Sequence, residues 1–337
     1  MARHPQPKGS PGLKTQSSNL LRTSGLAALL LATAAAPAQK DDAQTKTRRG
    51  DKGPTREYAI QPDFKDVKYG PHERNVLDFW KATSDDPTPV VVYIHGGGFR
   101  SGDKKTLSPG LLRSCLASGI SVAAIHYRLS DTAPFPAPMH DSVRAIQFIR
   151  TKASEWHLDP KRIACTGGSA GAGISLWIGF HDDMAKRGST DPVERQSSRI
   201  TCMFVQGAQC TYDPRAIKTI VGGRAHEHSA LPPFFGIEPD EADSAKAHKI
   251  YEESAAITYL TKDDPPVLAV YGDDRPDDKS PGKGIHNVNL GIHLKEKMDK
   301  LGIECIVIGP GIGEDQRHLA SGTEFFKKHF GIKANTR

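Results

Sequence analysis

A serine set among glycines is the first feature of this sequence that could do chemistry. Residues 167–171 read Gly-Gly-Ser-Ala-Gly, which matches the pattern G-x-S-x-G. An apolar run at 162–168 precedes Ser169 and a stretch of helical period at 171–186 follows it. This is the strand, turn and helix that the motif requires to expose a nucleophilic hydroxyl. A nucleotide-binding turn is the weaker alternative, because neither G-x-G-x-x-G nor G-x-x-x-x-G-K-[ST] occurs there.

A second glycine motif lies upstream, where His-Gly-Gly-Gly-Phe at 95–99 directly follows an apolar run of strand length. Successive glycines allow backbone N–H groups to turn toward a substrate oxygen, as in an oxyanion hole. We predict that Gly97, Gly98 and Ala170 supply these donors. We predict that His95 is a packed histidine that orients its neighbours and is not the catalytic base.

Five segments, in this order and spacing, resemble the α/β-hydrolases, in particular the hormone-sensitive-lipase-like and feruloyl-esterase-like carboxylesterases. They are HGGGFRSGD (95–103), HYRLS (126–130), FPAPMHD (135–141), DPKRIACTGGSAGA (159–172) and PPVLAVYGD (265–273). The resemblance covers roughly residues 62–330. It implies a Ser-Asp-His triad in that chain order, acyl-enzyme chemistry and no cofactor.

The resemblance also indicates where the acid should lie. In the family the acid follows the strand that begins with Pro-Pro, usually nine residues after the second proline, and that position is Arg275 here. A shift by one residue makes Asp274 the first choice, with Asp273 second and Asp277 third. The alternative that all three are solvated loop carboxylates stays open.

For the base, the family places a histidine after the last strand and before the final helix. His318 occupies that place, although the family commonly has His-Gly-Phe where this chain has His-Leu-Ala. His286 and His293 lie earlier, on or before the preceding helix. They could line the pocket or lie on a helix surface, and we predict His318 as the base.

These observations predict an exported serine hydrolase that cleaves carboxylic esters through an acyl-enzyme. Family analogy suggests a small-molecule or polysaccharide-linked ester as the substrate, such as an acetyl or feruloyl ester. A small prolyl-oligopeptidase-type peptidase is one alternative. A hydrolase-like binding protein with a decayed triad is another, and Arg275 at the expected acid position is its best support.

Strands and helices that must position these residues alternate along the chain, which predicts an α/β fold. The expected architecture is the α/β-hydrolase fold, with a mostly parallel central sheet of about eight strands flanked by helices. Residues 211–264 contain no clear strand and predict a cap-like insertion. Strands are expected at 65–70 and 75–82 (an antiparallel pair), 89–98, 120–129, 162–168, 202–208, 265–272 and 303–309, and helices near 105–118, 139–155, 171–186, 288–301 and 319–330.

The N-terminus predicts a targeting segment. Four basic residues and no acid precede twelve small or apolar residues at 25–36, which are too few to span a bilayer. We therefore expect a signal peptide at 1–38, a disordered linker at 39–57 and a hydrolase domain at 58–337. The expected location is secreted or periplasmic, without stable membrane insertion.

The basic charge of the chain lies mostly in this leader and linker. The formal net charge is +6, yet 35 basic and 35 acidic residues remain from Tyr58 onward. The charge balance therefore indicates no nucleic-acid partner. His226-Glu227-His228 is not H-E-x-x-H, so we predict no metal site.

The five cysteines are predicted to be mainly buried free thiols. They lie at positions 115, 165, 202, 210 and 305, three of them in apolar runs. Cys202 and Cys210 are the only nearby pair, and we do not expect them to form a disulfide.

Overall fold

The computed structural model describes residues 58–272, 275 and 279–333, which belong to a unit spanning Pro54–Arg337. The predicted signal peptide and linker lie outside the described residues. The candidate acids Asp273, Asp274 and Asp277 also lie outside them.

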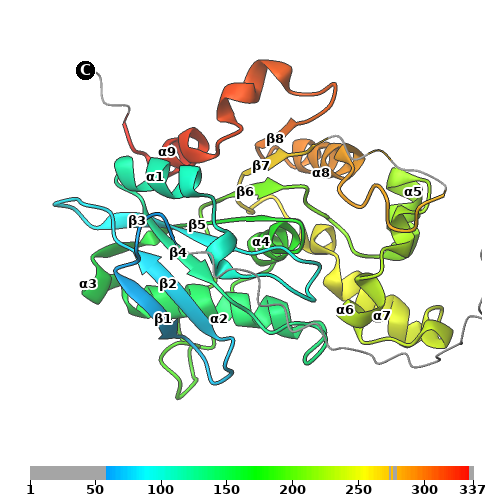
Figure 1. Ribbon diagram of the computed structural model, residues 1–337, viewed down its shortest axis with the longest axis horizontal. Coiled ribbons are helices and arrows are strands. Elements are labelled where there is room, and N and C mark those ends of the chain that lie inside the picture. Colours follow the sequence, from blue (N-terminus) through cyan, green and yellow to red (C-terminus); the bar gives the residue numbers. More distant parts are fainter. Residues whose placement is uncertain (1–57, 273–274, 276–278, 334–337) are drawn as a thin grey trace, which may run out of the picture. The chain divides into compact units, whose positions relative to one another are not determined.

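The described strands form a single eight-stranded sheet in the order β1-β2-β4-β3-β5-β6-β7-β8 (Figure 1). The strands are β1 Phe64–Lys68, β2 Val76–Trp80, β3 Thr88–Ile94, β4 Ser121–Ile125, β5 Leu158–Gly168, β6 Cys202–Gln206, β7 Val267–Val270 and β8 Cys305–Ile308. β2 runs antiparallel to β1 and β4, and all other neighbours are parallel. The predicted mostly parallel sheet and its antiparallel pair at the edge are confirmed.

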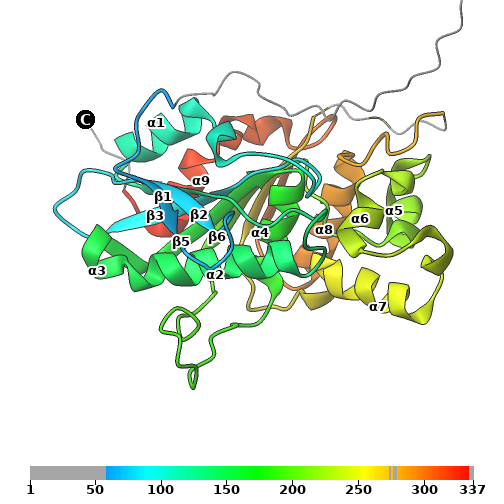
Figure 2. The ribbon, with the colours of Figure 1, turned by 60° about the horizontal axis from the view of Figure 1, so that its bottom comes forward.

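Helices cover both faces of this sheet, as Figure 2 shows. Helices α1 and α9 pack on one face through Leu112, Phe325 and Phe326, and α2, α4 and α8 contribute to the core on the other. Burial on both faces explains why β3 and β4 read as continuous apolar runs. The helices are α1 Pro109–Ala117, α2 Ala137–Thr151, α3 Ala153–Trp156, α4 Ala170–Phe180, α8 Val288–Lys300 and α9 Thr323–Phe330.

Residues 211–264, predicted as a cap-like insertion, are helical. They contain α5 Pro214–Val221, α6 Leu231–Phe235 and α7 Ala245–Ser254, with the 3-10 turns η2 Ala225–Glu227, η3 Pro239–Glu241 and η4 Ala256–Tyr259. Phe234 and Phe235 of α6 are buried in the same core as α2, α4 and α8. No helix in the described part of the chain is long and apolar enough to cross a bilayer.

The predicted state of the cysteines is confirmed. All five are buried free thiols, and Cys202 and Cys210 form no disulfide. Burial raises the pKa of the Cys165 and Cys210 thiols to about 12, so these thiols stay protonated and unreactive at neutral pH.

Two glycines let β3, β5 and the first turn of α4 meet backbone to backbone. A Cβ atom at Gly167 or Gly171 would overlap the carbonyl oxygen of Ile94 at the end of β3. Because this obstacle is backbone, it cannot move aside as a flexible side chain would. The G-x-S-x-G spacing is therefore required by close packing at this point.

We expect Gly171→Ala to lower the free energy of unfolding by about 1–3 kcal/mol or more, because the new methyl group would overlap the Ile94 carbonyl. Urea unfolding measures the effect. Gly110→Ala in α1 is the matched control, since its Cβ would lie 3.6 Å from the nearest atom. Equal stability of the two variants would contradict the packing argument.

Candidate active site

Ser169 occupies the sharp turn between β5 and α4 that the sequence predicts. Its backbone has φ 52° and ψ −120°, a conformation that is strained for a residue with a side chain. Two hydrogen bonds hold the turn: the Ser169 N–H donates to the Gln206 carbonyl at 2.9 Å, and the Gly173 N–H donates to the Ser169 carbonyl at 3.0 Å. The turn presents a half-buried hydroxyl at the carboxyl edge of the sheet.

The histidine that contacts this hydroxyl is His286. Its Nε2 lies 2.8 Å from Ser169 Oγ, which is the distance expected for a nucleophile and its general base. His286 lies in the loop that follows β7, directly before Asn287, the N-cap of α8. The ring packs against Gly207, where a Cβ atom would lie 3.3 Å from it.

This contact corrects the prediction that His318 is the base. His318 is exposed in the 3-10 helix η5 Glu314–Leu319, whereas the following Ala320 and Ser321 line the cavity at Ser169. After β8 the chain forms an isolated bridge between Gly309 and Ile312, and η5 then turns His318 toward solvent. The structure therefore replaces His318 by His286 as the histidine placed to accept the serine proton.

A local signal for His286 exists in the sequence GKGIHN. Gly282 and Gly284 both adopt positive φ, 79° and 90°, which lets the loop return toward the sheet edge. The asparagine after His286 then begins a helix. Its position between β7 and α8 led us to prefer His318 as the base. The structure shows that His286 lines the pocket, and that it also contacts the Ser169 hydroxyl. The acid stays a prediction, because Asp274 and its two alternatives are outside the described residues.

The glycine loop after β3 lies against the serine turn. Gly97, Gly98 and Phe99 have φ of 108°, 59° and 61°, so the loop needs left-handed conformations that glycine adopts readily. Gly98 and Ala170 border a cavity of about 20 Å³ together with Ser169. Gly97 does not line that cavity. Its carbonyl accepts hydrogen bonds from the N–H groups of Arg100 and Ser101.

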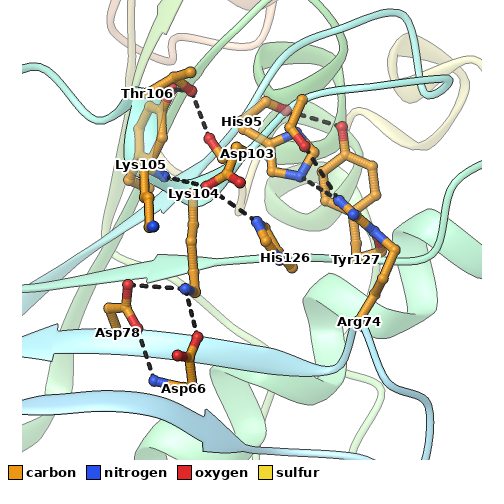
Figure 3. A network of polar contacts seen from close by, with 12 residues as sticks. Asp66, Arg74, Asp78, His95, Asp103, Lys104, Lys105, Thr106, His126 and Tyr127 are labelled. Carbon is orange, nitrogen blue, oxygen red and sulfur yellow. Dashed lines mark hydrogen bonds and ion pairs between the residues drawn. The ribbon is translucent and has the colours of Figure 1, made fainter. Parts of the chain in front are cut away.

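His95 is a packed histidine, as we predicted. Its ring is buried and stacks on Tyr127 with 4.3 Å between centroids, and the Tyr127 hydroxyl donates to the His95 carbonyl (Figure 3). Nδ1 lies 2.8 Å from the Gly96 carbonyl, which can only accept, and Nε2 lies 3.3 Å from the Arg74 guanidinium, which can only donate. Burial is the main reason that the pKa of His95 falls to about 3, so the ring is neutral.

The far end of the loop is held by a buried cation. Lys104 Nζ lies 2.7 Å from Asp66 of β1 and 2.9 Å from Asp78 of β2, and Asp78 is fully buried (Figure 3). Next to it, His126 Nε2 lies 3.3 Å from an Asp103 carboxyl oxygen. The neighbouring His126 imidazole lowers the pKa of Asp103. The glycine loop is thus fixed at both ends, by His95 and by Lys104.

A larger open cavity of about 740 Å³ reaches Ser169 and His286 from the side of α1. Its volume lies within the range of ordinary small-molecule sites. Hydroxyl and amide side chains are frequent around it, and they include those of Thr106, Ser114 and Gln206. Among the described residues, no group of three or more histidine, cysteine or acidic side chains is arranged to hold a metal.

A mostly parallel sheet with its serine on a strand-to-helix turn, and a histidine hydrogen-bonded to that serine, define an α/β-hydrolase. The BD-FAE family model matches residues 77–279, more than half of the chain. The chain therefore belongs to the BD-FAE family.

Several curated relatives carry esterase names. Esterase LipQ of Mycobacterium tuberculosis is 26% identical over 228 residues, which cover 66% of this chain and 51% of LipQ. Carboxylesterase NlhH of the same species is 38% identical over 97 residues, which cover 29% of this chain and 30% of NlhH. The chain thus spans about half or less of the length of these relatives.

Solved structures show the same fold. A truncated carbohydrate esterase from gut microbiota matches with a TM-score of 0.61 and 22% identity, covering 79% of this chain and 95% of that one. An acetyl ester-xyloside bifunctional hydrolase from Caldicellulosiruptor lactoaceticus matches with a TM-score of 0.61 and 18% identity. The match covers 82% of this chain and 100% of that one. At this identity the likeness shows a shared fold.

The neutral, buried His95 makes a pH-dependent contribution to stability. The pKa of His95 is about 3 in the folded chain, against an ordinary 6.5 in the unfolded chain. Between these two pH values the unfolded chain binds a proton that the folded chain does not. The free energy of unfolding therefore falls as the pH falls through this range. We expect His95→Gln to have a lower free energy of unfolding than wild type at pH 7.5. Because only wild type loses stability through His95 as the pH falls, this difference should be about 2 kcal/mol smaller at pH 5. Urea unfolding at both pH values measures it. A gap that does not change with pH would contradict a neutral buried His95.

Proposed function

We propose that this chain is a serine carboxylester hydrolase that works through an acyl-enzyme. The observation that supports this most is the 2.8 Å hydrogen bond between Ser169 Oγ and His286 Nε2 at a strained strand-to-helix turn. The pairing favours a catalytic site over the alternative of a decayed triad. The esterase names of the curated relatives favour esters over peptides as substrates.

In the proposed reaction, His286 Nε2 takes the proton from Ser169 as the serine oxygen attacks the ester carbonyl carbon. The resulting oxyanion is stabilised by the N–H groups of Gly98 and Ala170, with Gly97 as the third proposed donor. When the intermediate collapses, His286 gives the proton to the leaving alcohol, and the acyl group remains on Ser169. Water then attacks the acyl-enzyme, and His286 acts as base once more.

We further propose an acid, a location and a natural substrate for this enzyme. Asp274 is our choice for the carboxylate that orients the imidazole, and Asp273 and Asp277 are its alternatives. The basic leader and apolar run before Ala38 support export to the periplasm or the medium. A polysaccharide-linked ester is the proposed natural substrate, supported by the open cavity rimmed with hydroxyl groups and by the carbohydrate esterase among the fold neighbours.

We expect His286→Gln to lower kcat/KM for 4-nitrophenyl acetate by about 10²–10⁴-fold, because the serine loses its proton acceptor. Ser169→Ala should abolish turnover, with the fold checked by circular dichroism. His318→Gln is the matched control and should retain wild-type kinetics. The opposite pattern, an inactive His318→Gln beside an active His286→Gln, would restore His318 as the base.

A further inference from the structure

The half-buried Arg74 side chain contacts both ends of the glycine loop that follows β3. Its Nε donates a hydrogen bond to the Tyr127 carbonyl at 2.8 Å, and a terminal nitrogen lies 3.3 Å from His95 Nε2 (Figure 3). The same nitrogen donates to the Gly102 carbonyl at 3.3 Å. Among the described residues, no carboxylate forms an ion pair with Arg74. Its guanidinium is thus committed to neutral groups of this loop and of the neighbouring chain.

The turn between β1 and β2 fixes the backbone that carries Arg74. The Arg74 N–H donates to His72 Nδ1 at 3.1 Å, and the N–H of the buried Asn75 donates to the His72 carbonyl at 2.9 Å. The Asn75 carbonyl accepts from the Tyr69 N–H at 2.9 Å. A Cβ atom at Gly70 would lie 2.7 Å from the Asn75 amide oxygen, so the turn is closely packed. Arg74 therefore reaches the glycine loop from a fixed base.

The two ring nitrogens of His95 have partners of opposite kind. The Arg74 guanidinium can only donate, so Nε2 of the neutral ring must accept. The single ring proton is then on Nδ1, which donates to the Gly96 carbonyl at 2.8 Å. Burial is the main reason that the pKa of His95 falls to about 3, and the charge of Arg74 adds to it. Arg74 therefore favours one of the two neutral tautomers of His95.

The Gly96 carbonyl belongs to the same planar peptide unit as the Gly97 N–H. In a trans peptide these two groups point in opposite directions, so a hydrogen bond that holds the carbonyl also sets the direction of the N–H. The unit lies between two glycines, which allow it to flip at little steric cost unless it is held. Among the described residues, none accepts a hydrogen bond from the Gly97 N–H, which is left for the substrate oxygen.

On the basis of the serine hydrolase function proposed above, we propose that Arg74 is a positioning residue of the oxyanion hole. It acts through His95: it selects the tautomer with the proton on Nδ1, which holds the Gly96 carbonyl and so directs the Gly97 N–H toward the oxyanion. Its hydrogen bond to the Gly102 carbonyl fixes the other end of the same loop.

The variant Arg74→Met removes the donors and keeps an unbranched side chain. We expect kcat/KM for 4-nitrophenyl acetate to fall about 10²-fold, the effect of a group misplaced by about 1 Å. The inhibition constant of a trifluoromethyl ketone, whose adduct carries an oxyanion, should rise by a similar factor. Circular dichroism checks the fold. A folded Arg74→Met with wild-type kcat/KM would overturn the proposal.

Arg144→Met is the matched control. The Arg144 Nε also donates to a backbone carbonyl, that of Tyr69, at 2.9 Å, and a terminal nitrogen binds Asp191. None of its hydrogen bonds goes to a described residue of the glycine loop. This variant should keep wild-type kcat/KM. An equal loss in Arg144→Met would show a general effect of removing an arginine and would overturn the assignment to Arg74.

A double-mutant cycle tests whether Arg74 acts through His95. The amide nitrogen of an asparagine at this position stands near the place of Nδ1 and can donate to the Gly96 carbonyl without any choice of tautomer. In the His95→Asn background, Arg74→Met should therefore cost much less than the roughly 10²-fold loss expected in wild type. An equal cost in both backgrounds would overturn the route through His95.

The tautomer is also measured directly, without His95→Asn. ¹⁵N NMR of the histidine-labelled protein should show the His95 proton on Nδ1, with the signal assigned by its loss in His95→Gln. In Arg74→Met, Nε2 is free to donate to water, so the form with the proton on Nε2 should appear. A proton on Nε2 in wild type, or an unchanged tautomer in Arg74→Met, would overturn the proposal.

Failure of the underlying function looks different. A chain that is no serine hydrolase would not turn over 4-nitrophenyl acetate even as wild type, and a fluorophosphonate would leave its Ser169 unlabelled. If only the role of Arg74 is wrong, wild type and Arg74→Met are both active and both labelled at Ser169.

Discussion

The site depends on one close approach of backbone to backbone. The end of β3 presents the Ile94 carbonyl to Gly167 and Gly171, where no side chain could fit. That contact sets the path of the turn between β5 and α4, and so holds Ser169 in its strained conformation with positive φ. It also places the glycine loop that continues from β3 beside the serine. A single packing constraint thus brings Ser169 and the glycine loop together.

Other parts of the structure stabilise this arrangement from outside. The Lys104 ammonium, buried with Asp78, ties the far end of the glycine loop to β1 and β2. Removing one partner of such a pair would leave a buried charge, so the anchor is costly to break. The cap approaches from the other side and brings Ala230 against Gly98. The glycine loop is therefore held from two sides, by Lys104 and by the cap.

Much of this could be predicted from sequence because it is encoded locally. Continuous apolar runs identified the strands, and glycine spacing identified the turn at Ser169 and the loop after His95. The base could not be predicted in this way. Whether His286 or His318 reaches Ser169 depends on how the loops after β7 and β8 fold back over the sheet edge, and η5 turns His318 outward through tertiary packing.

The central claim is that Ser169 is a nucleophile activated by His286. The most direct measurement is to label the intact protein with a fluorophosphonate at neutral pH and to locate the adduct by mass spectrometry. We predict one adduct on the peptide that contains Ser169, formed much more slowly in His286→Gln. Labelling of a different residue, or equal labelling rates with and without the imidazole of His286, would contradict it.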